Sequence, residues 1–187
     1  MEPIIQMWLP ILLSAVAVFI LSSIIHMVLK YHNTDFQPLP NEEQVMEDLG
    51  KHNLPPGEYN FPRAKDMKEM GSPEFIEKMK KGPVGFMTVM ENAPPNIGKQ
   101  LVLWFIYSII VGIFAAYIAG HGLGPGARYL AAFRLVGSTA FVCYGLALIQ
   151  NSIWYKRGWA STSKSLFDSL IYALFTAGIF AWLWPAA

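Results

Sequence analysis

Long apolar blocks alternate with polar stretches along the chain. The apolar blocks cover residues 4–29, 101–119, 129–149 and 166–184. A helix needs about 20 apolar residues to cross a hydrocarbon core about 30 Å thick, and each block is close to or above that length. The pattern therefore predicts a mainly α fold class: a four-helix polytopic membrane bundle with one transmembrane helix for each block.

The polar stretch between the first two blocks, residues 30–100, carries start and stop signals of its own. Asn41 and Ser72 each precede a short amphipathic helix as cap residues do. The predicted elements are helices over 42–49 and 73–81 and strands over 58–61 and 84–90. We expect a small α+β insert that is too short to bury a core of its own and that leans on the membrane surface or on a partner.

Three segments result from this division: a first transmembrane helix over 1–29, a polar insert over 30–100 and a three-helix transmembrane region over 101–187. The 187 residues are 53% hydrophobic and 14% charged, which favours a polytopic membrane protein over a soluble domain. A formal net charge of +1 leaves no electrostatic footprint for nucleic acid. The single cysteine, Cys143, lies within an apolar block, so an internal disulfide is excluded and we interpret it as a packing residue.

Basic residues near the ends of the apolar blocks predict the orientation. Only Arg128 lies close to a block end on the side shared by the two termini and the glycine-rich turn 120–126. The opposite side has several basic residues close to block ends: Lys30, Lys99, Lys156, Arg157 and Lys164. The positive-inside rule therefore places residues 30–100 in the cytoplasm and both termini outside.

Small residues recur every fourth position along the second apolar block. They are Ser108, Gly112, Ala116 and Gly120. This spacing lets two helix backbones approach closely in lipid, so we expect this face to be a helix-packing contact. Residues 151–165, rich in Ser, Thr and charge, are predicted to form the loop between the third and fourth helices.

Three ionisable residues lie within the apolar blocks: His26, Arg134 and Asp168. His26 is four residues from Lys30 and Asp168 is four residues from Lys164, so both lie about 6 Å inside the same boundary at ~1.5 Å per residue. Arg134 enters from the other side and is separated from Asp168 by roughly 15 Å. His26 and Asp168 can therefore meet, whereas Arg134 is an isolated intramembrane charge.

We hypothesise a polar cluster of His26 and Asp168 at the inner end of the bundle. Ser22 and Tyr172, each one helical turn away, would complete it. The alternative is that both ionisable groups are merely interfacial, with His26 reaching the headgroups and Asp168 stabilised in the first turns of its helix. Arg134 would likewise reach outward to phosphates or cap carbonyls of the glycine-rich turn.

No constellation in the sequence predicts catalysis, a cofactor or a metal. Among His26, His32, Asp35 and His52 we identify no i,i+3, i,i+4 or C-x-x-C spacing of the kind that marks a metal site, so we expect no metal. Haem would need two histidines at one level, but His26 and His121 belong to opposite sides. A nucleophile, base and orienting acid at recognisable spacing are also missing, so no catalytic residue is predicted.

Three stretches of the chain stand out in combination: Pro55-Pro56-Gly57-Glu58-Tyr59-Asn60-Phe61-Pro62, Gly82-Pro83-Val84-Gly85-Phe86-Met87-Thr88-Val89 and the Gly120-His121 turn. Together they resemble a family of small bacterial inner-membrane proteins with four transmembrane helices. The resemblance implies a bacterial inner (cytoplasmic) membrane location. No activity, cofactor or catalytic residue comes with it.

We therefore expect a non-enzymatic integral membrane protein, an accessory, assembly or scaffold subunit acting through its cytoplasmic insert. The expected partners are the lipid bilayer and either a protein partner or a second copy of the chain, with no nucleic acid and no identified small-molecule substrate. The alternative is a small oligomeric transporter or proton/ion conductor that uses His26, Asp168 and Arg134.

Overall fold

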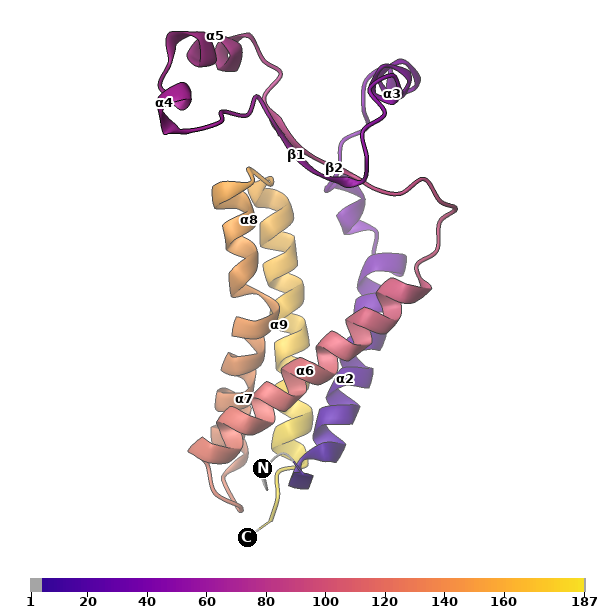
Figure 1. Ribbon diagram of the computed structural model, residues 1–187. Helices are drawn as coiled ribbons and strands as arrows, with labels where there is room; N and C mark the ends of the chain where they lie inside the picture. The colour runs from indigo at the N-terminus through magenta and orange to yellow at the C-terminus, as the bar shows by residue number, and fades with distance from the viewer. Residues whose placement is uncertain (1–4, 187) are drawn as a thin grey trace. The chain divides into compact units, whose positions relative to one another are not determined.

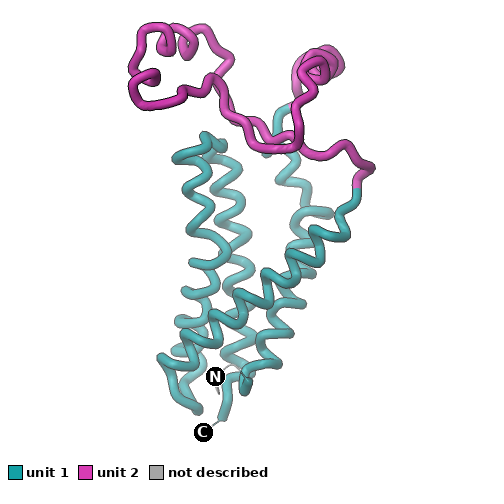
Figure 2. The backbone as a smooth tube through the Cα atoms, in the orientation of Figure 1, with its two compact units in different colours: residues 1–37, 96–187 teal, residues 38–95 magenta. Residues whose placement is uncertain are grey.

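The computed structural model describes residues 5–186 and divides into two compact units. Unit 1 comprises residues 1–37 and 96–187, and unit 2 comprises residues 38–95 (Figure 2). The aqueous unit is thus shorter than the polar stretch 30–100. Residues 30–37 belong to unit 1, because Tyr31 and Asp35 hydrogen-bond to residues of its last helix.

Unit 1 is built from helices, most of them long. They are α2 (Trp8–Ser23) with its π-helical extension η1 (Ile24–Val28), α6 (Gly98–Gly122), α7 (Tyr129–Tyr144), α8 (Ile149–Trp154) and α9 (Trp159–Trp182) (Figure 1). Two 3₁₀ turns, η2 (Tyr31–Thr34) and η3 (Leu146–Leu148), complete it. Within residues 5–186, four helices are long and apolar enough to cross a membrane: Trp8–Val28, Gly98–Gly122, Tyr129–Trp154 and Trp159–Trp182.

The predicted loop over 151–165 is wrong, because α8 and α9 occupy most of it. The hydroxyl groups of this segment form hydrogen bonds within and between the two helices, so they do not interrupt the helices. The Ser152 and Thr162 hydroxyls lie 2.7 Å apart, and Ser165 Oγ donates to the Ser161 carbonyl at 3.0 Å. The fourth helix therefore begins at Trp159, several residues earlier than the apolar pattern indicates.

The helices of unit 1 pack through small side chains. Gly112 of α6 faces α2 so closely that an added Cβ would lie 3.4 Å from the Ile11 Cα atom. Gly137 of α7 approaches Ala177 of α9 in the same way, at 3.1 Å from its Cβ. The interior between the helices is filled by fully buried apolar residues, among them Ala15, Val18, Val111, Ala115, Val136, Ala140, Ala177 and Phe180.

The small-residue face of α6 therefore packs inside the chain. Ser108, Gly112 and Ala116 are buried and Gly120 is half-buried. Since α2 of the same chain covers Gly112, this face does not by itself call for a helix of another protein.

The two termini of the helical unit and the glycine-rich turn meet at one end. The Trp184 indole N–H donates to the Gly124 carbonyl at 3.1 Å, and the Gly126 N–H donates to the Pro185 carbonyl at 2.8 Å. Met7 and Ala119 belong to the same buried cluster against which Trp184 packs. The turn is thus closed by the segment that follows α9.

Unit 2 consists of three short helices and two antiparallel strands. These are α3 (Glu42–Gly50), β1 (Gly57–Phe61), α4 (Met67–Met70), α5 (Pro73–Lys81) and β2 (Gly85–Val89). Tyr59 is paired with Met87 at the middle of the two strands. Ser72 caps α5 by accepting the Phe75 N–H at 3.2 Å, and Asp66 caps the unpredicted helix α4.

Asn41 does not cap α3 in the predicted way. Its backbone is left-handed, with φ at 52°, and its side chain accepts no hydrogen bond from the helix. Asn tolerates this conformation better than most residues, so Asn41 serves the turn rather than the helix end.

Candidate functional site

A reversal of the chain at the end of the first membrane-length helix, Trp8–Val28, creates a polar cluster. The helix widens to a π-turn, with the Leu29 N–H bonded to the Ile24 carbonyl at 3.1 Å. Lys30 then adopts a left-handed conformation with φ at 50°, and η2 follows directly. Both are sparsely populated backbone states, and together they place residues 31–35 against α9.

Asp168 of α9 is the centre of this cluster. Its side chain is buried, with 3% of the residue exposed, in the middle of a helix that is otherwise largely apolar. His32 Nε2 lies 2.7 Å from Asp168 Oδ2, and the Tyr31 hydroxyl donates to Oδ1. A buried carboxylate needs such donors, because an unpaired charge in this position costs several kcal/mol.

The second ring nitrogen of His32 reaches a second carboxylate. Nδ1 lies 2.7 Å from Asp35 Oδ2, so the imidazole bridges Asp35 and Asp168. The His32 ring donates hydrogen bonds to both carboxylates at once only when both of its nitrogens carry a proton, that is, when the ring is an imidazolium. The ring then balances part of the charge of the two acids.

Lys164 of α9 holds residues 31–35 against that helix. Its ammonium donates to the Tyr31 carbonyl and the Thr34 hydroxyl, each at 2.7 Å, and to Asp35 Oδ1 at 3.0 Å. Arg157 adds a weaker ion pair with Asp35 at 3.9 Å. All three donors of the lysine ammonium are used, so η2 is clamped to α9.

These contacts shift the pKa values of the groups in residues 31–35. Burial alone raises the pKa of the Asp35 carboxyl, but hydrogen bonds from His32, Lys164 and Ser161 outweigh it and lower the pKa to about 2. Burial, followed by the hydrogen bond to Asp168 and its negative charge, raises the pKa of the Tyr31 phenol well above 10.0. Asp35 is therefore ionised and Tyr31 is a neutral donor at physiological pH.

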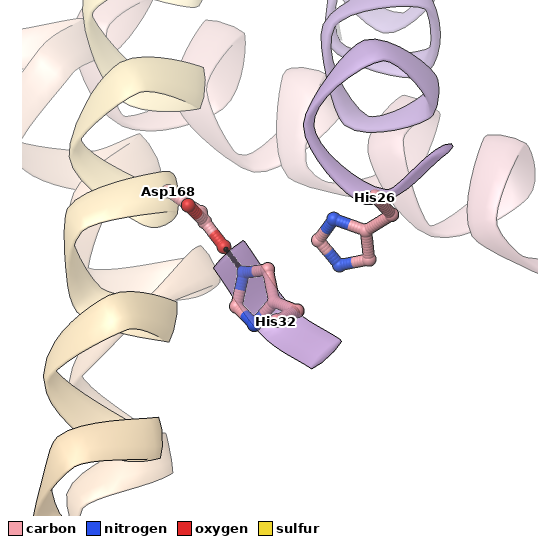
Figure 3. Close-up of side chains that lie close together, drawn as sticks. All are labelled: His26, His32 and Asp168. Atoms are coloured by element: carbon pink, nitrogen blue, oxygen red, sulfur yellow. Dashed lines mark hydrogen bonds and ion pairs between the residues drawn. The ribbon is translucent and has the colours of Figure 1, made fainter. Parts of the chain in front are cut away.

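His26 projects into the cluster from the π-turn. Its ring is stacked at a tilt on that of His32, with the ring centroids 4.6 Å apart. Figure 3 shows the side chains of His26, His32 and Asp168 pointing toward one another from three different elements. One potential ligand atom of each residue lies within 4.8 Å of the other two, an arrangement of two imidazoles and one carboxylate that is able to hold a metal ion.

The residues predicted from the sequence are distributed as follows. The structure brings His26 and Asp168 together, with His32 between them. Ser22 accepts the Trp104 indole N–H at 2.8 Å and donates to the Phe19 carbonyl at 2.9 Å, so it lies in an aromatic layer next to the cluster. Tyr172 belongs to the same layer, its ring 5.8 Å from that of Trp104.

The interfacial alternative for Asp168 is wrong in its premise. Because α9 begins at Trp159, Asp168 is in the interior of the helix and not in its first turns, where the helix dipole acts. Arg134 is exposed on α7, and within residues 5–186 the structure shows no hydrogen bond or ion pair for its side chain.

His32, Tyr31, Asp35 and Lys164 are the members of the cluster that the sequence did not point to. His32 and Asp35 are three residues apart, so the expectation that these residues share no i,i+3 spacing is wrong, and this spacing was the available signal that their side chains can meet on a helical turn. Their contact with α9 had no local signal, because Lys164 and Asp168 come more than 120 residues later in the chain.

No protein-family model, curated protein or solved structure matches this chain.

Proposed function

We propose that this protein is a non-enzymatic accessory subunit of a bacterial inner membrane, which binds a protein partner through unit 2 on the cytoplasmic side. The observation that carries the proposal is the imbalance within unit 2. Among residues 38–95, Phe75 is the one apolar side chain classed as buried, at 8% exposure, whereas many large apolar side chains are exposed. A unit with so little core gains free energy by covering such side chains with a partner.

The exposed apolar side chains gather around a hollow of about 340 Å³ between α5 and the strands. Met70 of α4 and Met79 of α5 line this hollow, and they are 51% and 41% exposed. The other apolar lining residues are Phe61, Pro62, Ala64, Phe75, Val84 and Phe86. Methionine adapts to differently shaped apolar groups, so this lining suits an apolar side chain of another polypeptide.

Basic residues near the hollow indicate the charge of that partner. Arg63 contributes to the lining, and the last turn of α5, outside the lining, contains Lys78, Lys80 and Lys81, of which Lys80 is paired with Glu77 at 3.0 Å. A partner segment with an apolar residue next to acidic residues would complement both features.

The polar cluster supports the proposal in a second way. The chain enters unit 2 immediately after residues 31–37, and Lys164 and Asp168 hold residues 31–35 on α9. Residues 31–35, which precede unit 2 in the chain, are thus held by several buried or half-buried polar contacts within unit 1.

The packing of unit 1 favours this function over ion or proton conduction. Between the level of Asp168 and the level of Arg134, the buried residues include the apolar Val136, Ala140 and Ala173, and the buried hydroxyls of Thr139 and Thr176 donate to carbonyls of their own helices. A conduction path needs polar or water-lined positions at that depth. Arg134 is exposed on α7 and, within residues 5–186, the structure shows no ion pair between it and Asp168.

Site-specific photo-crosslinking in native membranes tests the proposal. A photoreactive amino acid at Met79 is expected to give one discrete protein adduct, while the same group at Glu77, two residues away on α5 and not part of the hollow, gives none. Adding Met70→Glu should abolish the Met79 adduct, and Thr88→Glu on an exposed strand position should leave it. Adducts to lipid alone, or equal adducts at Met79 and Glu77, would contradict the proposal.

A further inference from the structure

We propose that His26, His32 and Asp168 bind one divalent transition-metal ion, of the zinc class, where the first membrane helix ends. The three residues come from the π-turn η1, the 3₁₀ turn η2 and α9, so the ion would join three elements of unit 1 (Figure 3). The site is distinct from the docking surface of unit 2 and does not depend on it.

The spacing of the ligand atoms requires only a small adjustment. A tetrahedral ion about 2.1 Å from each ligand holds its ligand atoms roughly 3.4 Å apart. One imidazole nitrogen of each histidine and one oxygen of Asp168 already lie within 4.8 Å of one another, and His32 Nε2 and Asp168 Oδ2, now 2.7 Å apart, would have to separate by less than about 1 Å to admit the ion. His26 is exposed and sits on an irregular turn, so its ring can rotate by this amount without displacing packed residues.

The outer partners of two ligands are already in place. A histidine that binds a metal through one nitrogen usually donates the other N–H to a carboxylate, which orients the ring. His32 has that arrangement, since its Nδ1 lies 2.7 Å from Asp35 while Nε2 faces Asp168. The carboxylate of Asp168 is in turn held by the Tyr31 hydroxyl on one oxygen, which leaves the other for the ion.

His26 is the residue that an ion pair alone does not explain. Within residues 5–186, its ring nitrogens have no hydrogen-bond partner, yet the ring lies against His32 and close to Asp168. Two histidines beside one acid repel each other if both are charged. With a bound ion, both are neutral ligands, and the ion takes the place of the proton between His32 Nε2 and Asp168.

The ligand types narrow the choice of ion. Two imidazoles and one carboxylate suit Zn²⁺, Fe²⁺, Co²⁺ or Ni²⁺, whereas Mg²⁺ and Ca²⁺ prefer oxygen ligands throughout. His26 lies at the exposed side of the group and Asp168 at the buried side. Water or an added ligand would therefore occupy the fourth position from the side of His26.

Metal binding to the purified full-length protein tests this assignment. The protein is prepared in detergent with an affinity tag that contains no histidine, and is titrated with Zn²⁺ by calorimetry and with Co²⁺ by visible absorption. One ion per chain is expected, with cobalt bands typical of tetrahedral nitrogen and oxygen ligands, and Mg²⁺ should not compete.

Two substitutions separate a metal site from a structural ion pair. His26→Ala removes a ligand that makes no hydrogen bond in the described structure, so the protein should stay folded while Zn²⁺ affinity falls at least 100-fold. His121→Ala is the matched control, because His121 bonds to the Tyr117 carbonyl at the opposite end of the helices. Absence of stoichiometric Zn²⁺ binding at micromolar concentrations, or unchanged affinity in His26→Ala, would overturn the proposal.

Discussion

At the scale of single residues, two unusual backbone positions create the polar cluster. The π-turn changes the direction in which His26 projects, and Lys30 reverses the chain so that Tyr31 and His32 meet α9. Such strained or irregular positions persist only where surrounding contacts hold them, and here Lys164 contributes three hydrogen bonds to the reversed segment. The cluster and the backbone reversal therefore stabilise each other.

The pKa of Asp35 predicts how this segment responds to acid. In the folded protein the pKa is about 2, below its ordinary 3.8, so the contacts of ionised Asp35 contribute stability above pH 3.8. That contribution is lost as the pH falls through about 2. Hydrogen exchange of residues 31–35 in detergent should accelerate within this window relative to the body of α9.

Asp35→Asn is the informative comparison for the acid response. The amide cannot be ionised, so exchange of residues 31–35 should already be faster at neutral pH and should change little between pH 4 and pH 2. Asp48→Asn, at an exposed ion pair with Lys51, should behave as the wild type does. An acid response that Asp35→Asn leaves intact would mean that another group controls the segment.

At the scale of elements, glycine positions decide how closely the helices approach. Gly112 allows α2 to pass directly over α6, and Gly145 lets the end of α7 lie against Ser169, whose Cβ atom would be 3.0 Å from an added Cβ. α7 ends at Tyr144 and η3 follows the glycine, so the third span contains a break that its hydropathy does not reveal. Small residues within spans are thus contact positions as much as breaks.

Enlarging Gly112 is expected to separate the first two membrane helices. Its added Cβ would lie 3.2 Å from the Ile11 Cγ2 atom and 3.4 Å from the Ile11 Cα atom, so Gly112→Leu forces the α2 backbone to shift. Overpacking of this kind costs about 1–3 kcal/mol. The Tm in detergent should fall accordingly.

Gly178→Ala in α9 is the control for this substitution. Its added Cβ would meet only the Tyr129 hydroxyl, at an ordinary 3.9 Å, so the helix propensity of alanine should leave the Tm unchanged or raise it slightly. If Gly112→Leu were as stable as Gly178→Ala, the close contact between α2 and α6 would be refuted.

At the scale of the whole molecule, unit 2 is inserted in the chain between the first and the second apolar helix of unit 1. Basic residues gather at the end of unit 1 that carries the polar cluster: Lys30, Lys99, Lys156, Arg157 and Lys164. Arg128 is the basic residue adjoining the start of α7 at the other end. We propose from this asymmetry that residues 38–95 lie in the cytoplasm.

Labelling of single cysteines tests the orientation. In a Cys143→Ala background, a membrane-impermeant maleimide should modify Gly124→Cys in intact cells, because the turn 120–126 is expected to lie outside. Met70→Cys should react only after the cells are permeabilised. Reaction of Met70→Cys in intact cells would place unit 2 outside and contradict the topology.

The sequence by itself determined the features that depend on local pattern. Apolar length determined the four membrane-length helices, because a backbone in lipid must satisfy its hydrogen bonds within each span. Cap residues and turns determined α5 and the positions of both strands. Counting residues from Lys30 and Lys164 also placed His26 and Asp168 at one depth, since helical rise is constant.

Only the tertiary structure decided which side chains meet. His32, Tyr31 and Asp35 belong to the cluster because the chain reverses at Lys30 and because hydroxyl-rich residues extend α9 back to Trp159. Neither event has a signal in hydropathy, because the reversal at Lys30 depends on contacts with distant Lys164 and Asp168, and the start of α9 depends on hydroxyl hydrogen bonds of residues that hydropathy counts as polar. The same holds for the small-residue face of α6, whose spacing indicates a close helix contact while the fold determines that α2 makes it.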